Sequence, residues 1–161
     1  MNGAKASLIF TDPPYNVTIA GNVGGNGQIH HREFAMGSGD MTPAAFTDFL
    51  KKTLQLLVAN SQDGSIHYTC MDWRHMQEIL AAGYAVYSEL KNVCVWNKTN
   101  GGMGTFYRSK HEMVFVWKSG TAPHLNNFEL GQHGRNRTNV WDYAGVNTFR
   151  VEWTNSRCTQ Q

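Results

Sequence analysis

The stretch SLIFTDPPYN at residues 7–16 places a rigid turn directly after a short apolar run. The run Ser7–Phe10 is typical of a buried β-strand. Two prolines, which cannot donate to a sheet ladder, end that strand. The residue before a proline is pushed out of the helical region, so Asp12–Tyr15 should be stiff and extended. Ligands of α/β sheets bind beyond the carboxyl ends of strands, which makes this turn the first candidate for a functional site.

Two amphipathic helices are predicted farther along the chain. Thr42-Pro43 supplies an N-cap and a proline at the first helical position. The apolar residues of this helix recur at helical spacing: Phe46, Phe49, Leu50, Leu54, Leu57 and Val58. Asn60–Gly64 should end it. Asp72 is expected to cap a second helix that ends at Gly83. The core-facing residues of that helix should be Met76, Ile79 and Leu80.

Three more strands are predicted, at residues 65–70, 89–97 and 112–118. The last two should form an antiparallel pair joined by a long glycine-rich loop. Alternation of strands and helices implies an α/β sheet with helical crossovers. Residues 16–40 show no periodicity and are interpreted as a functional loop or a disordered segment. The periodicity also disappears beyond Ser119.

Length and composition favour one soluble globular domain. The chain has 161 residues, 41% of them hydrophobic and 16% charged, which argues against disorder. No apolar stretch is long enough for a membrane span, and no secretory signal is evident. Cys70, Cys94 and Cys158 are odd in number and far apart, which favours a reducing cytoplasm over a disulfide framework.

The charge is distributed unevenly along the chain. Residues 98–161 carry eight Lys/Arg against four Asp/Glu, a net of +4, whereas residues 1–97 carry six against eight, a net of −2. A basic excess of this kind is compatible with phosphate contacts. The seven histidines lack metal-ligand spacing, so no metal site is expected.

The turn combines hydrogen-bond acceptors with an aromatic face. Neither proline offers an N–H, so the backbone presents carbonyls next to the Asp12 carboxylate, and Tyr15 adds a flat ring. Two acceptors can bind both N–H groups of an exocyclic nucleobase amine while the base stacks on the ring. The alternative is a simple strand-ending turn, in which Asp and Pro are frequent.

TDPPYN resembles the catalytic motif of amino-group DNA methyltransferases, which methylate adenine N6 or cytosine N4 with S-adenosylmethionine. Further segments are similar to one bacterial and phage subgroup of DNA modification methylases: HREFAMGSGDMTPAAFTDFL, GSIHYTCMDWRHM, NVCVWNKTNGGMGTFYRSKHEMVFVWKSG and TNVWDYAGVNTFR. The resemblance covers residues 7–150 and has the β-type order, in which the catalytic half precedes the cofactor half. It implies a partial Rossmann-like methyltransferase sheet in an N4/N6-type domain at 1–150, followed by a flexible polar tail at 151–161.

The resemblance also implies roles for the motif residues. Asp12 and the Pro13 carbonyl would bind the target amine and adjoin the S-adenosylmethionine, with Pro14 completing the motif. Tyr15 would stack on the flipped base, and Asn16 would shape its pocket. Transfer to the amine would be direct, and the base must first leave the duplex. Asp at the first motif position favours adenine over cytosine.

One family feature is missing. Members continue into a DPFxGxG-like glycine loop, the main seat of the cofactor, and neither Gly24–Gly27 nor Gly101–Gly104 follows a strand and opens a helix. After Arg150 the chain is polar and unlike the family. We therefore expect a truncated methylase with weak or no activity alone. The alternatives are an enzyme completed by a second chain or homodimer partner, and a noncatalytic DNA- or protein-binding remnant.

Basic and amide side chains are candidates for DNA contacts. One group flanks the glycine-rich loop and is interpreted as either a solvated hairpin tip or a DNA backbone clamp: Lys98, Arg108 and Lys110. Another lies in the irregular C-terminal third, and its side chains are of the types that read guanine and adenine edges: Arg135, Arg137 and Asn139. Four aromatic residues are expected in the core instead: Trp96, Trp117, Trp141 and Phe149.

Overall fold

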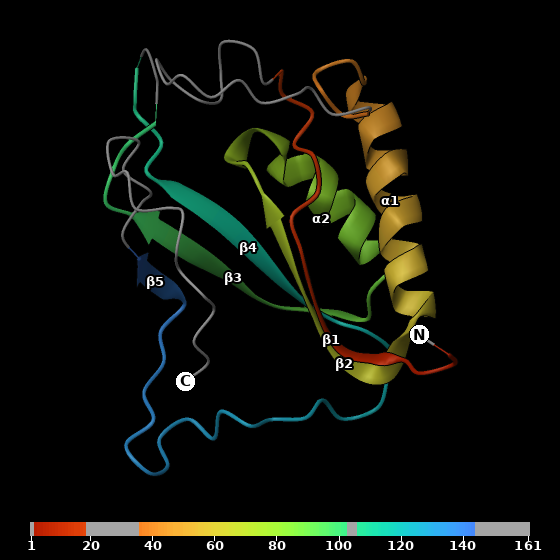
Figure 1. Ribbon diagram of the computed structural model, residues 1–161, viewed down its shortest axis with the longest axis vertical. Coiled ribbons are helices and arrows are strands. Elements are labelled where there is room, and N and C mark those ends of the chain that lie inside the picture. Colours follow the sequence, from red (N-terminus) through yellow and green to blue (C-terminus); the bar gives the residue numbers. More distant parts are fainter. Residues whose placement is uncertain (1, 19–35, 103–105, 144–161) are drawn as a thin grey trace.

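The computed structural model describes residues 2–18, 36–102 and 106–143. Within these residues one mixed sheet has the strand order β1-β2-β4-β3-β5 (Figure 1). The strands are β1 (Ala6–Thr11), β2 (Ser61–Met71), β3 (Glu89–Lys98), β4 (His111–Lys118) and β5 (Val140–Tyr143). β1 runs parallel to β2, β3 runs parallel to β5, and β4 is antiparallel to both β2 and β3. The predicted α/β sheet with a helical crossover and an antiparallel strand pair is confirmed.

Two helices cover one face of the sheet. They are α1 (Pro43–Ala59) and α2 (Met76–Tyr84), the latter preceded by the short 3₁₀ helix η1 (Trp73–His75). The Thr42 hydroxyl accepts a hydrogen bond of 3.2 Å from the Ala45 amide, so the predicted N-cap is confirmed. The expected break after α1 is shorter than predicted. Asn60 alone caps the helix, and β2 begins at Ser61 because that residue already pairs with Ala6 of β1.

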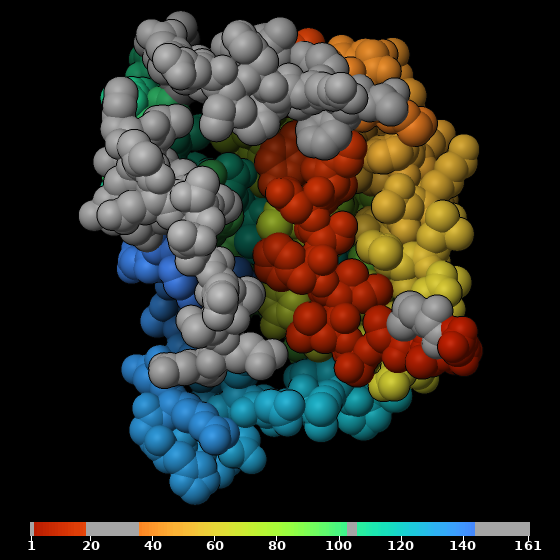
Figure 2. Space-filling model, viewed as in Figure 1, coloured from red at the N-terminus to blue at the C-terminus, as the bar shows by residue number. Residues whose placement is uncertain are grey.

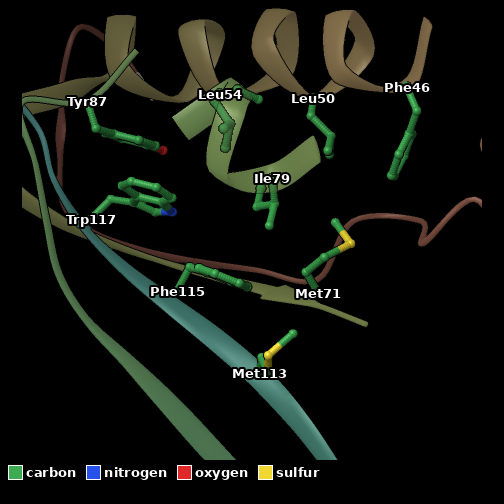
Figure 3. Close-up of a cluster of buried hydrophobic side chains, with 10 residues drawn as sticks. Phe46, Leu50, Leu54, Met71, Ile79, Tyr87, Met113, Phe115 and Trp117 are labelled. Atoms are coloured by element: carbon green, nitrogen blue, oxygen red, sulfur yellow. The ribbon is translucent and has the colours of Figure 1, made fainter. Parts of the chain in front are cut away.

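The main core lies between the helices and the sheet (Figure 3). It contains Phe46, Leu50 and Leu54 of α1, Ile79 of α2, and Met71, Met113, Phe115 and Trp117 of the central strands. The Trp117 indole is fully buried and stacks at 5.4 Å on Tyr87 and at 6.3 Å on Phe115, measured between ring centroids. Aromatic packing around Trp117 therefore forms the contact between helix α2 and strand β4.

Helix α2 differs from its prediction in two ways. Gly83 does not end the helix, which continues to Tyr84 and is capped by Ala85. A Cβ at Gly83 would overlap the Trp117 ring, so this glycine allows the helix to approach the sheet closely. Met76, predicted to face the core, is 45% exposed because it opens the helix at the sheet edge, whereas Ile79 is fully buried.

Two strands also depart from expectation. β1 was predicted to be buried, yet Leu8 is 57% and Phe10 is 59% exposed. β1 lies at the sheet edge and only its alternate residues face the helices, so the other side chains point to the uncovered face. Figure 2 shows β1 and the following turn, in red, at the surface beside α1. β5 was not predicted, since its four residues lie in a region without periodicity.

A smaller apolar cluster lies on the opposite face of the sheet. It is formed by Cys70, Cys94, Val114 and Val116, with Tyr68 and Trp141 packed against it. Both thiols are free. The three tryptophans expected in the core differ in burial. Trp117 is buried as predicted, Trp141 is half-buried, and Trp96 is 37% exposed. Cys158, Phe149 and the predicted tail at 151–161 lie outside the described residues.

His67 of β2 is a buried histidine within the core. Its ring nitrogens lie 3.0 Å from the Ser65 hydroxyl and 2.8 Å from the Tyr87 hydroxyl. Burial lowers the pKa of His67 to about 4, so the imidazole is neutral at pH 7 and bridges two hydroxyl groups.

The free energy of unfolding is expected to fall at acidic pH because His67 is buried in its neutral form. Because its folded pKa lies below the unfolded value of about 6.5, the unfolded chain binds the proton first. The contribution is fully present above pH 6.5 and is lost as the pH falls to about 4, by roughly 3 kcal/mol at most. Urea unfolding at several pH values measures how steeply the free energy of unfolding depends on pH, which is the slope that His67 should set. His67→Gln should flatten it, whereas His133→Gln, at an exposed site, should not. An unchanged slope in His67→Gln would exclude the assignment.

Candidate active site at the carboxyl edge of the sheet

One edge of the sheet brings together the turn at residues 12–16 and polar residues from three other strand ends. The parallel strands β1, β2 and β3 end there, and β4 begins there because it runs in the opposite direction. The turn 12–16 follows β1, Asp72 follows β2, Lys98 ends β3 and His111 opens β4. The turn therefore lies where the sequence predicted, beyond the carboxyl end of a strand.

Asp12 and Tyr15 form a hydrogen-bonded pair within this turn. The Tyr15 hydroxyl donates to Asp12 Oδ1 at 2.6 Å, and the carboxylate is exposed. The Tyr15 ring is half-buried and packs against both apolar clusters. Burial, and then the bond to Asp12, raise the pKa of Tyr15 far above its usual value. The phenol is therefore a permanent donor that orients the Asp12 carboxylate.

Asn16 ties the turn to the segment preceding α1. It is buried and has a left-handed φ of 52°, which asparagine tolerates better than most residues. Its Nδ2 donates to the Met41 carbonyl at 2.9 Å, and its Oδ1 accepts from the amides of Gly39 and Met41 at 3.2 Å each. These three bonds attach the end of the turn to residues 39–41. Asn16 is thus a positioning residue for the turn, and its predicted part in a base pocket stays a prediction.

The sheet order also brings in side chains that sequence reasoning missed. Glu112 of β4 accepts a hydrogen bond of 2.6 Å from the Lys98 ammonium and faces Trp96 across the β3–β4 ladder. Lys98 lies 5.0 Å from the centre of the Trp96 ring. Cys70 adjoins the same site. Burial, followed by the charges of Asp12 and Glu112, raises the pKa of its thiol to about 12. No local motif marks Glu112, because only the strand order places it near Asp12.

Two of the three loop cations predicted to contact DNA are engaged within the protein. Lys98 pairs with Glu112, and the Arg108 guanidinium donates to the carbonyls of Gly101 and Gly102 at 2.8 Å each. Lys110 is exposed. All three lie at the same sheet edge as Asp12, because the loop joins the end of β3 to the start of β4. Their contact with DNA stays a prediction.

The second predicted DNA-binding group lies elsewhere. Arg135 pairs with Glu129 at 2.9 Å, and Arg137 lies 4.8 Å from the Phe128 ring. Asn139 donates to the Val93 carbonyl at 3.2 Å and so helps attach β5 to β3. These residues precede β5, at its amino end, whereas Asp12 lies at the carboxyl edge. The structure therefore does not bring the two sets of residues together.

The described part of the chain contains no group of three His, Cys, Asp or Glu side chains arranged to hold a metal ion. Nor does it contain a helix with the length and apolarity needed to cross a bilayer.

Comparison with known proteins identifies the family of this chain. A family model for N6/N4-type DNA methylases matches residues 6–161, almost the whole chain. The chain belongs to this DNA methylase family. A search of curated proteins finds no match to this methylase chain.

Two examples illustrate the solved structures that have a similar fold. One is M1.HpyAVI, with a TM-score of 0.53 and 12% identity over 86% of this chain and 57% of that chain. The other is TTHA0409 of Thermus thermophilus, complexed with S-adenosyl-L-methionine, with a TM-score of 0.51 and 14% identity over 92% of this chain and 64% of that chain. This methylase chain thus spans less than two thirds of the length of each.

Proposed function

We propose that this chain carries the catalytic turn of an S-adenosylmethionine-dependent DNA methyltransferase. The target is an exocyclic base amine, with adenine N6 favoured over cytosine N4. The observation that carries the proposal is the exposed Asp12 carboxylate, oriented by the Tyr15 hydroxyl directly beyond the carboxyl end of β1. Membership of the DNA methylase family supports methyl transfer as the reaction in which this carboxylate takes part.

The residues at this edge fit a cationic methyl donor. S-adenosylmethionine, when bound, supplies a methyl group activated by a positively charged sulfur. Asp12 provides negative charge next to the Tyr15 ring, whereas the charge of Glu112 nearby is balanced by Lys98. Asp12 and Pro13 would adjoin the cofactor. We further propose that a second chain or a homodimer partner contributes residues that complete the cofactor site.

The turn would act by binding and orienting the amine. The Asp12 carboxylate and the Pro13 carbonyl accept its two N–H groups, which directs the nitrogen lone pair away from the turn. The Asp12 charge stabilises positive charge that develops on the nitrogen, and the carboxylate can then accept the released proton. A covalent enzyme intermediate on Cys70 is disfavoured, since this buried thiol with a pKa of about 12 is protonated. The base must leave the duplex to reach the turn.

Methylation of DNA by the purified chain tests the proposal. DNA without methylated adenine is incubated with tritium-labelled S-adenosylmethionine at saturating concentration, and the products are digested to nucleosides. We expect slow formation of N6-methyladenine. N4-methylcytosine would correct the target base, and the absence of any methylated nucleoside would exclude activity of this chain alone. Calorimetry adds a second test, since micromolar binding of S-adenosylmethionine by this chain would exclude a noncatalytic remnant.

A further inference from the structure

Two aromatic side chains project from the loop between β3 and β4. Phe106 is 87% and Tyr107 is 82% exposed, the highest values among the large hydrophobic side chains of the described residues. Their ring centroids lie 4.6 Å apart at an interplanar angle of 70°. The pair thus forms an apolar surface that other described side chains leave exposed to solvent.

Hydrogen bonds brace the chain on both sides of the pair. The Arg108 side chain binds the carbonyls of Gly101 and Gly102, and the Gly102 amide donates to the Ser109 carbonyl at 2.7 Å. The Trp73 indole of η1 donates to the Ser109 hydroxyl at 3.1 Å, which ties the loop to the end of β2. The two aromatic residues are therefore held out from a braced segment. Large apolar groups presented in this way mark an interaction surface.

The surroundings of the pair select the kind of partner. The segment from Lys98 to His111 contains three Lys/Arg and no Asp or Glu. It lies at the same edge of the sheet as Asp12. A partner for this surface must offer flat apolar groups together with negative charge. Nucleic acid with unpaired bases meets both requirements. Its base faces can stack on the aromatic rings, and its phosphates can contact the cations.

We propose that Phe106 and Tyr107 form an aromatic wedge that stacks on DNA bases left unpaired when the target base leaves the duplex. Lys110 contacts a neighbouring phosphate. In other DNA-binding proteins, apolar side chains are inserted between base steps of distorted DNA, and aromatic side chains stack on unpaired bases. This inference rests on the proposed function and identifies residues of that site that recognise distorted DNA.

Fluorescence anisotropy with the full chain tests the wedge. The probes are two labelled oligonucleotides of the same length, a fully paired duplex and a duplex with a central mismatched bubble. We expect Phe106→Ala/Tyr107→Ala to weaken bubble binding by about 10-fold or more and duplex binding by less than about 3-fold. Tyr107→Phe should retain the bubble affinity, since stacking needs the ring and not the hydroxyl. Leu125→Ala/Leu130→Ala removes exposed apolar side chains from a different segment and should change neither affinity.

Each outcome has a distinct meaning. An equal loss on both probes, or no loss, overturns the wedge. So does an effect confined to self-association in sedimentation, which would assign the aromatic pair to a protein interface. If the wild-type chain methylates DNA while the double variant keeps the bubble preference, the wedge alone fails. If the wild-type chain shows the wedge-dependent preference but no methyl transfer, the enzymatic proposal fails and the wedge remains.

Discussion

Asp12→Asn is expected to lower the rate of methyl transfer by about 100- to 1,000-fold, a loss typical of removing one preorganised electrostatic group. The substitution removes the negative charge that stabilises a developing positive charge on the amine nitrogen. It also introduces an N–H donor where the base amine requires an acceptor. The Tyr15 hydroxyl can still donate to the remaining carbonyl oxygen, so the turn should keep its shape. Single-turnover transfer of a labelled methyl group to DNA measures the effect.

Asp72→Asn is the matched control for this substitution. Asp72 also follows a strand at the same edge, but its carboxylate binds the Arg74 amide at 2.9 Å and guanidinium at 3.0 Å. Loss of part of this cap should cost about 1 kcal/mol of stability and leave the rate within about 3-fold. Similar rates for Asp12→Asn and wild type, with both chains folded, would remove Asp12 from the reaction.

Trp117→Ala is expected to lower the free energy of unfolding by about 3–5 kcal/mol. The indole is fully buried, contacts the rings of Tyr84, Tyr87 and Phe115, and fills the space left by Gly83. Its removal leaves a cavity at the junction of α2 and β4. Because domains of this kind are stable by only about 5–15 kcal/mol, the loss is a large fraction of the total. Urea unfolding followed by far-UV circular dichroism gives the value.

Trp96→Ala is the control that shows whether the loss of stability depends on burial or only on removing a tryptophan. Trp96 lies on the neighbouring strand and is 37% exposed, with Lys98 over its ring. We expect a loss of about 1 kcal/mol or less, since less of its surface is removed from water on folding than for Trp117. Equal losses for both tryptophans would contradict the assignment of the core to the helix-covered face.

The buried core and the candidate active site lie on different parts of the same sheet. The helix-covered face holds the buried aromatic core. The carboxyl edge carries the Asp12 turn, the Lys98–Glu112 pair and the exposed aromatic pair. Asn16 links the two regions, because its side chain attaches the turn to the segment that leads into α1. Variants of the edge should therefore alter chemistry with small changes in stability, and variants of the core the reverse.

Local chemistry explains which features could be predicted from the sequence. Thr42-Pro43 starts α1 because capping and a fixed φ act over a few residues. The apolar runs of β3 and β4 predict strands whatever lies beside them. The Asp12 turn could be placed at a strand end because two prolines stop the ladder there. The motifs around that turn were also sufficient to indicate the family.

Features that depend on contacts between distant segments became visible only in the tertiary structure. The exposure of Leu8 and Phe10 depends on β1 being an edge strand, which the composition of the strand does not determine. Gly83 looked like a helix end, although its small size serves the contact with Trp117. Glu112 lies near Asp12 because β4 runs antiparallel between β2 and β3. The sequence by itself determined the start of α1, the strands β3 and β4 and the turn at Asp12, since short-range forces set them. Only the tertiary structure decided which side chains surround the turn, because strand order joins residues about 100 positions apart.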